Sequence, residues 1–210
     1  MKVYGDILSG NCYKVKLVLN QLAIPHEWIH VDILKGEAKT IDFLKLNPNG
    51  KIPVLVLDGG EVLCESNAII NFLADGTHLI PSDKLSRAHL LEWQFFEQYS
   101  HEPYIAVARF IKMYLRMPES HIEVFESKKE GGIKALKVME KALHGRDFFV
   151  NNKYSIADIS LFAYTHVAEE GGFDLTEFPL INLWLKRVSE QNGYISMYEI
   201  ADKTGIKRLS

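Results

Sequence analysis

The chain has little cysteine and no long run of apolar residues. Cys12 and Cys64 are the two cysteines among 210 residues, they lie far apart, and neither belongs to a C-x-x-C pair. Two isolated cysteines exclude a disulfide framework, a thioredoxin dithiol and a cysteine-rich zinc site. No apolar run approaches the roughly 18 residues of a membrane span, no N-x-S/T sequon occurs, and the N-terminus does not resemble a signal peptide. We therefore expect a cytoplasmic protein.

The sequence also has no long stretch in which charged residues of one sign are concentrated. The formal net charge is −3, and the basic residues form only a minor cluster at positions 203–208, so we expect no nucleic-acid partner. Gly50-Lys51 is not followed by Ser or Thr, which excludes a P-loop, and no G-x-G-x-x-G follows a predicted strand. The eight histidines show no metal-ligand spacing. We expect no metal and no prosthetic group.

The most informative stretch runs from residue 47 to residue 67. It predicts a loop, a strand opened by Pro53, a hairpin on Asp-Gly-Gly, a second strand and a helix that begins near Ser66. Because proline has no N–H, the backbone of Ile52 before it is expected to be extended and unpaired, and able to receive a peptide. Glu65 and Ser66 stand at a helix start, where free N–H groups favour a carboxylate.

The N-terminal residues form a second pattern of the same kind. Residues 2–4 predict a short strand, and apolar residues then repeat at helical spacing from Val15 to Leu22. The loop that ends in Ser9-Gly10-Asn11-Cys12 therefore lies at a helix N-terminus, which stabilises a thiolate.

Together these motifs resemble the glutathione-binding half of the glutathione transferase family. The resemblance implies that the Ile52-Pro53 bond is cis and that the Ile52 backbone pairs with the cysteinyl unit of glutathione. It also implies that Glu65 and Ser66 hold the γ-glutamyl end. Lys39 and Lys51 are candidates for the glycyl carboxylate, with Lys51 preferred because it adjoins Ile52.

The residue that activates the glutathione sulfur is left open among four candidates. Ser9-x-x-Cys12-x-x-Val15 resembles the serine-type transferases, of a theta-like or nu-like bacterial class, so Ser9 ranks first. Asn11 ranks second because it resembles an asparagine beside the sulfur in some bacterial and fungal relatives. Tyr4 ranks third, since it lies inside the predicted strand, and Cys12 ranks fourth as a small buried hydrophobe.

Beyond residue 76 the sequence pattern is helical almost throughout. We divide the chain into a thioredoxin-like α/β domain at 1–76, a linker at 77–85 and an all-α domain at 86–210, as in the glutathione transferase fold. The predicted helices cover 86–117, 119–143, 155–169 and 179–191, the first being either kinked or broken at Pro103. Ser155 and Asp158 predict an acidic capping box with a structural role.

A second substrate is expected between the domains. Its candidate contacts are on the aromatic helix around Pro103, with a further contribution from the tail after Tyr194, and the helix residues are Tyr104, Val107, Arg109 and Ile111. The resemblance also implies a homodimer in which the segment 93–99 contributes to the interface.

The resemblance implies a detoxifying glutathione S-transferase, with glutathione as co-substrate and a small electrophile, peroxide or disulfide as its target. Two alternatives remain. One is a glutathione-dependent peroxidase or disulfide-bond reductase on the same fold, favoured if Asn11 holds the sulfur. The other is a non-enzymatic binding module.

Overall fold

A computed structural model describes residues 1–204, which fall into two compact units. The first unit comprises Met1–Asp75 together with residues 192–204, and the second comprises Gly76–Gln191. Residues 192–204 thus group with the first unit, whereas the sequence-based division placed them in the helical domain. Most of the basic cluster at 203–208 lies outside the described residues.

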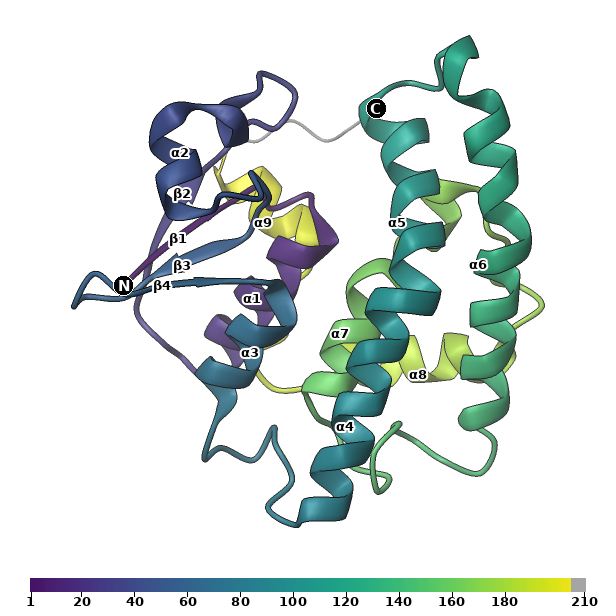
Figure 1. Ribbon diagram of the computed structural model, residues 1–210. Helices are drawn as coiled ribbons and strands as arrows, with labels where there is room; N and C mark the ends of the chain where they lie inside the picture. The colour runs from purple at the N-terminus through teal and green to yellow at the C-terminus, as the bar shows by residue number, and fades with distance from the viewer. Residues whose placement is uncertain (205–210) are drawn as a thin grey trace. The chain divides into compact units, whose positions relative to one another are not determined.

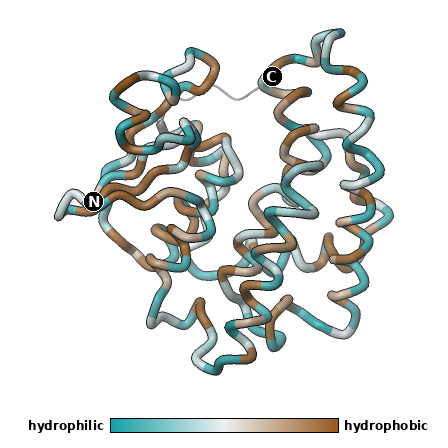
Figure 2. The backbone as a smooth tube through the Cα atoms, viewed as in Figure 1, coloured by the Kyte–Doolittle hydropathy of each residue, from teal (hydrophilic) through white to brown (hydrophobic). Residues whose placement is uncertain are grey.

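The first unit is built on a four-stranded mixed sheet with the strand order β2-β1-β3-β4. Strand β1 is parallel to β2 and antiparallel to β3, which is antiparallel to β4. Apolar residues of the middle strands appear in brown (Figure 2). The strands are β1 (Lys2–Gly5), β2 (Glu27–His30), β3 (Val54–Val56) and β4 (Val62–Cys64).

Helices cover both faces of this sheet (Figure 1). Side chains alternate between the faces of a strand. On one face, the Gly5 backbone approaches Cys12 so closely that a Cβ would lie 2.8 Å from its Sγ atom. On the other face, the ring of Tyr4 packs edge-on against Phe43 of α2. The helices of this part are α1 (Gly10–Gln21), η1 (Glu37–Lys39, a 3-10 turn), α2 (Ile41–Leu46) and α3 (Ser66–Ala74), which confirms the thioredoxin-like order of elements.

The C-terminal segment of the first unit lies against α1. The Tyr13 hydroxyl donates to the carbonyl oxygen of Ile195 at 2.8 Å, and the Asn20 amide donates to that of Gly193 at 2.8 Å. The last helix, α9 (Met197–Thr204), follows.

The second unit is helical, as predicted. The two halves of its first segment are joined by a π-helical turn, η2 (Glu97–His101), so the path does not break at Pro103. Pro103 lies in the first turn of α5, where an N–H is not needed by the helix. The elements of this unit are α4 (Lys84–Phe96), η2, α5 (Glu102–Arg109), η3 (Phe110–Tyr114), η4 (Glu119–His121), α6 (Ile122–Ala142), α7 (Ile156–Thr165), η5 (Ala168–Gly171) and α8 (Pro179–Ser189).

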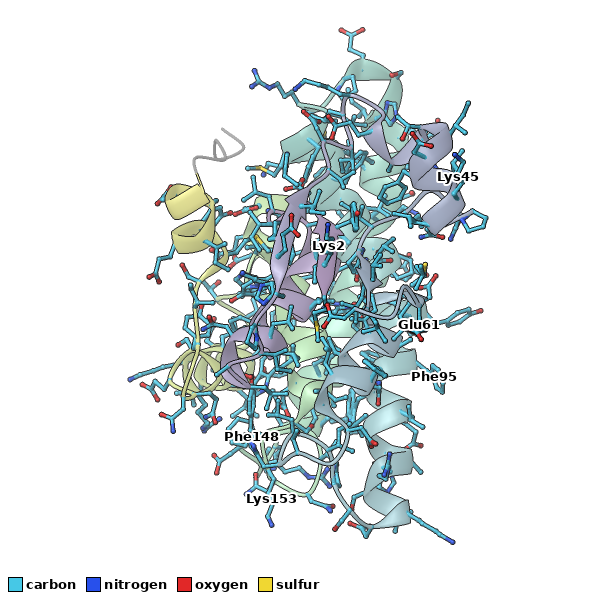
Figure 3. The ribbon with its side chains drawn as sticks, turned by 90° about the vertical axis from the view of Figure 1, so that its left-hand side faces the viewer. Lys2, Lys45, Glu61, Phe95, Phe148 and Lys153 are labelled. Atoms are coloured by element: carbon cyan, nitrogen blue, oxygen red, sulfur yellow. The ribbon has the colours of Figure 1, made fainter. Side chains whose placement is uncertain are left out.

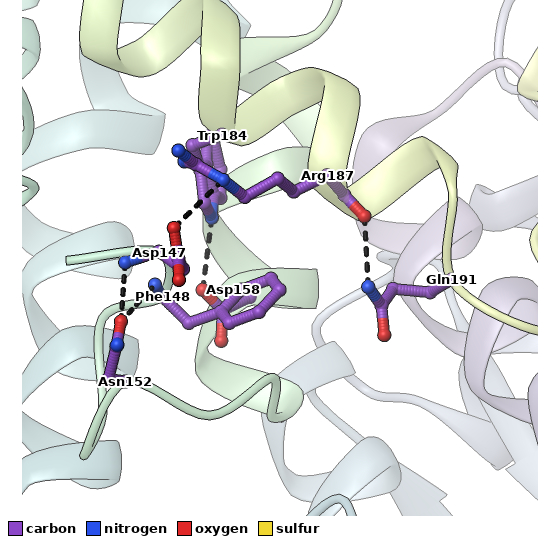
Figure 4. A network of polar contacts seen from close by, with 7 residues as sticks. All are labelled: Asp147, Phe148, Asn152, Asp158, Trp184, Arg187 and Gln191. Atoms are coloured by element: carbon purple, nitrogen blue, oxygen red, sulfur yellow. Dashed lines mark hydrogen bonds and ion pairs between the residues drawn. The ribbon is translucent and has the colours of Figure 1, made fainter.

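The predicted capping box at the start of α7 is confirmed. The Ser155 side chain accepts from the backbone of the first turn, and the Ser155 N–H donates to the Asp158 carboxylate at 3.0 Å. The Phe149 N–H also donates to this carboxylate at 3.2 Å. The indole of Trp184 on α8 donates to it at 3.0 Å (Figure 4). Asp158 therefore joins three segments of the second unit. Among residues 1–204, no helix is both long and apolar enough to cross a bilayer.

Candidate functional site

The loop before β3 is fixed by one asparagine. The Asn47 amide donates to the carbonyl oxygen of Lys51 at 2.7 Å, and its oxygen accepts from the Asn49 N–H at 3.0 Å. Gly50 takes the left-handed conformation, with φ of 60°, that closes the turn. The Ile52-Pro53 peptide bond is cis, as the resemblance implies, and β3 begins directly after it.

Lys39 and Lys51 lie at this same loop. The Lys39 ammonium donates to the carbonyl oxygen of Asn49 at 3.3 Å, and both lysines are exposed. Ile52 packs against the apolar cluster that includes Ala38 and Phe43. The structure thus places two lysines and the backbone of Ile52 at one loop.

The start of α3 carries an unusual backbone. Glu65, directly before the helix, has φ of 66° and ψ of 115°, a conformation that costs a non-glycine residue about 1 to 3 kcal/mol. Such residues occur often at binding sites, where the surrounding structure holds them in place. Ser66 is the first residue of the helix and is 5% exposed.

The starts of α1 and α3 meet through their side chains. The Ser66 hydroxyl donates to the amide oxygen of Asn11 at 3.2 Å, and the Lys14 ammonium donates to the same oxygen at 2.9 Å. Two helix N-termini with polar side chains thereby converge, an arrangement that suits an anion. The sequence analysis missed Lys14. Its signal was the three-residue spacing from Asn11, which places both side chains on one helix face.

Ser9 occupies the N-cap position of α1 without acting as a cap. Its side chain makes no hydrogen bond to the helix backbone and instead pairs with the Cys12 thiol. Burial raises the pKa of Cys12 to about 12, and this outweighs the hydrogen bonds from Ser9 and the Asp6 backbone, which act in the opposite direction. Cys12 is therefore a protonated, packed thiol, while the Ser9 hydroxyl is not committed to capping.

Tyr4 is removed from this cluster by the strand geometry. Its ring lies 6.5 Å from that of Phe43, on the face of the sheet opposite to Cys12. The structure therefore argues against Tyr4 as a partner of a sulfur atom near Ser9.

Three of the four second-substrate candidates have other roles in the second unit. Arg109 and Ile111 are each 2% exposed, and Arg109 forms an ion pair of 2.6 Å with Glu170. Tyr104 packs on α6, where any side chain at Gly131 would collide with its ring. Val107 remains partly exposed. Helical spacing in the sequence does not tell a pocket from a core, so it did not indicate that Arg109 and Ile111 are buried.

Comparison with known proteins agrees with this geometry. Residues 8–75 match the family model of the glutathione S-transferase N-terminal domain, and residues 94–192 match that of the C-terminal domain. Glutathione S-transferase 3 of Zea mays is 35% identical over 165 residues, which cover 75% of this chain and 73% of that protein. The chain belongs to the glutathione S-transferase family.

Two further proteins are similar to this chain. A crystal structure of a glutathione S-transferase from Pseudomonas fluorescens is 57% identical, with a TM-score of 0.91, and the match covers 93% of this chain and 98% of that one. The disulfide-bond oxidoreductase YfcG of Escherichia coli is 29% identical over 187 residues, 86% of each chain.

Proposed function

We propose that this glutathione S-transferase acts in the cytoplasm and binds glutathione on its first unit. The observation that carries the proposal is the contact between Asn11 and Ser66, which joins the N-termini of α1 and α3 beside the strained backbone of Glu65. A carboxylate is stabilised at such a place by helix dipoles and N–H groups. We assign the α-carboxylate of the γ-glutamyl unit to Ser66 and its ammonium to Glu65.

The rest of the tripeptide lies along the loop that leads into β3. The cysteinyl unit pairs with the backbone of Ile52 before Pro53, in the manner of an added strand. The glycyl carboxylate reaches the exposed lysines of the loop, Lys51 first and Lys39 second. This order takes account of the Lys39 ammonium, which already donates to the carbonyl oxygen of Asn49.

The chemistry is activation of the glutathione thiol by a hydrogen bond. A thiol with pKa near 8.5 is only a few per cent ionised at neutral pH, and lowering it by two units requires about 2.7 kcal/mol. A hydrogen bond from the Ser9 hydroxyl and the start of α1 together supply energy of this size. The thiolate then attacks an electrophilic carbon, its sulfur forms the new bond, and the leaving group departs with the electron pair.

A second function is reduction of a disulfide by glutathione. It is favoured by the position of Asn11 within the polar cluster and by the similarity to YfcG. In that reaction the glutathione thiolate attacks one sulfur of the disulfide, the S–S bond breaks, and a thiolate leaves. Asn11 would then replace Ser9 as the partner of the sulfur.

Calorimetric titration with glutathione tests the proposal directly. Ser66→Ala should weaken binding by about 1 to 3 kcal/mol, because it removes a donor to a charged carboxylate. Ser127→Ala is the matched control, since Ser127 is exposed and bonds only its own helix backbone in the second unit. Undiminished affinity in Ser66→Ala would refute the assigned carboxylate site. Turnover of 1-chloro-2,4-dinitrobenzene, cumene hydroperoxide and 2-hydroxyethyl disulfide separates transferase, peroxidase and reductase.

We also propose that the protein forms a homodimer through α4 and η2. Leu91, Phe95 and Tyr99 recur every four residues and are 41%, 68% and 85% exposed, and Phe95 points away from its helix (Figure 3). A stripe of this kind favours a protein partner. Trp93, included in the predicted interface segment, instead packs 4.5 Å from the ring of Phe149. Phe95→Glu should convert the dimer to a monomer in sedimentation.

A further inference from the structure

Lys14 is a fully buried cation beside the proposed glutathione site. It lies in the second turn of α1, its side chain has no exposed surface, and its ammonium donates to the amide oxygen of Asn11 at 2.9 Å. A lysine is rarely buried to this extent, because removing its charge from water is costly. Its hydrogen bond to Asn11 places this charge where the starts of α1 and α3 meet.

The Asn11 amide is oriented by two donors. Its oxygen accepts from Lys14 and from the Ser66 hydroxyl, and an amide oxygen has two lone pairs to offer. The oxygen branch of the planar amide is thus committed to this side. The NH2 branch, which is a donor, is directed the other way.

Ser66 has a single hydroxyl proton, and this proton decides the role of Lys14. In this structure the proton is given to Asn11. A carboxylate is only an acceptor, so Ser66 can bind one only by turning its proton away from Asn11 toward the ligand. The oxygen of Asn11 then keeps one of the two donors, the ammonium of Lys14.

We infer that Lys14 is a positioning residue, which holds the Asn11 amide in place while Ser66 is engaged with the glutathione carboxylate. The inference rests on the proposed function, because it assigns a glutathione carboxylate to Ser66. Lys14 acts through Asn11 and touches neither the sulfur nor the electrophile. Without it, the oxygen of Asn11 loses the donor that remains when Ser66 turns to the ligand.

The test is a double-mutant cycle between Lys14→Met and Asn11→Ala, read by the dissociation constant of glutathione and by the thiol pKa of the bound tripeptide. Lys14→Met should weaken glutathione binding about tenfold, the size expected for a lost charge-assisted hydrogen bond. In the Asn11→Ala background the same change should have no further effect, because the residue through which it acts is already absent. A structural role would give additive losses.

Lys16→Met is the matched control on the same helix. Lys16 is also partly buried, but its ammonium contacts His26 at 2.8 Å and lies 5.4 Å from the ring centre of Trp28, away from Asn11 and Ser66. We expect its glutathione affinity to equal that of the wild type. If Lys14→Met does not fold, Lys14→Gln replaces it, and its retained donor should preserve more affinity than Lys14→Ala.

The outcomes separate the inference from the proposed function. A wild-type protein that fails to bind glutathione overturns both. Normal binding by the wild type with unchanged affinity in Lys14→Met, or with equal losses in both backgrounds, overturns the role of Lys14 alone.

Discussion

The indole nitrogen of Trp184 donates a hydrogen bond of 3.0 Å to the buried carboxylate of Asp158. Burial nevertheless raises the pKa of Asp158 to about 6, because the bonds from Trp184, Phe149 and Ser155 only partly offset the loss of water. At the other end of α7, burial lowers the pKa of His166 to about 4, and its Nε2 atom is shielded from solvent. Burial thus raises the pKa of a carboxyl group near the start of α7 and lowers the pKa of an imidazole at its end.

We predict that these two groups give opposite contributions to the pH dependence of stability. Asp158 binds its proton more tightly in the folded chain, so its contribution to the free energy of unfolding falls between about pH 4 and pH 6, by about 3 kcal/mol. His166 loses its proton more easily in the folded chain, so its contribution rises from about pH 4 to pH 6.5. In the wild type the two contributions should therefore largely cancel, so that together they change the free energy of unfolding little between about pH 4 and pH 6.

Single variants separate the two contributions to the pH dependence of the free energy of unfolding. In urea titrations at successive pH values, Asp158→Asn should become more stable as pH rises from 4 to 6, and His166→Gln should become less stable. Parallel profiles for the wild type and both variants would contradict the assignment.

The partner of the sulfur is tested by two substitutions at the start of α1. Ser9→Ala should raise the thiol pKa of bound glutathione by about one to two units and cut turnover about ten- to a hundredfold, with little change in affinity. Asn11→Ala should act mainly on affinity, because Asn11 is bonded to Ser66. The opposite ranking transfers sulfur activation to Asn11 and favours the reductase. An unchanged thiol pKa in both variants leaves activation to the N–H groups of α1.

The glycyl end is tested with a shortened ligand. Lys51→Ala should weaken glutathione binding by a factor of about two to five, which is the range for an exposed ion pair. The dipeptide γ-glutamylcysteine lacks the glycyl carboxylate, so its affinity should be the same in the wild type and in Lys51→Ala. Equal losses for both ligands would place Lys51 elsewhere in the site, and Lys39→Ala is the parallel variant.

The two cysteines should differ in reactivity. Cys12 is fully buried and protonated, whereas Cys64 is partly exposed, although burial and Glu65 raise its pKa as well. In the absence of glutathione, iodoacetamide should therefore modify Cys64 first, as read by peptide mass mapping. Cys12→Ala should keep turnover within about threefold of wild type, since the protonated thiol is not a nucleophile. A large loss of turnover in a normally folded Cys12→Ala would restore a redox role for this residue.

Local signals in the sequence located much of the candidate site. Pro53 before an apolar strand and Ser66 at a helix start are readable from a few neighbouring residues, because turns and helix ends depend on local backbone chemistry. The role of Arg109 was not readable, because its partner Glu170 comes from a distant segment. The contact of Lys14 with Asn11 is local, whereas the hydrogen bond from Ser66 to Asn11 joins residues 55 positions apart and was likewise not readable.

The return of the chain from the second unit to α1 has a consequence for biosynthesis. Tyr13 donates to the carbonyl oxygen of Ile195, and Asn20 donates to that of Gly193. The first unit is therefore held together by contacts between the two ends of the described chain. During translation, the segment 1–75 leaves the ribosome long before residues 192–204 exist. The first unit therefore lacks these contacts while the intervening helices are synthesised. It can complete its fold only after the helical unit has been made.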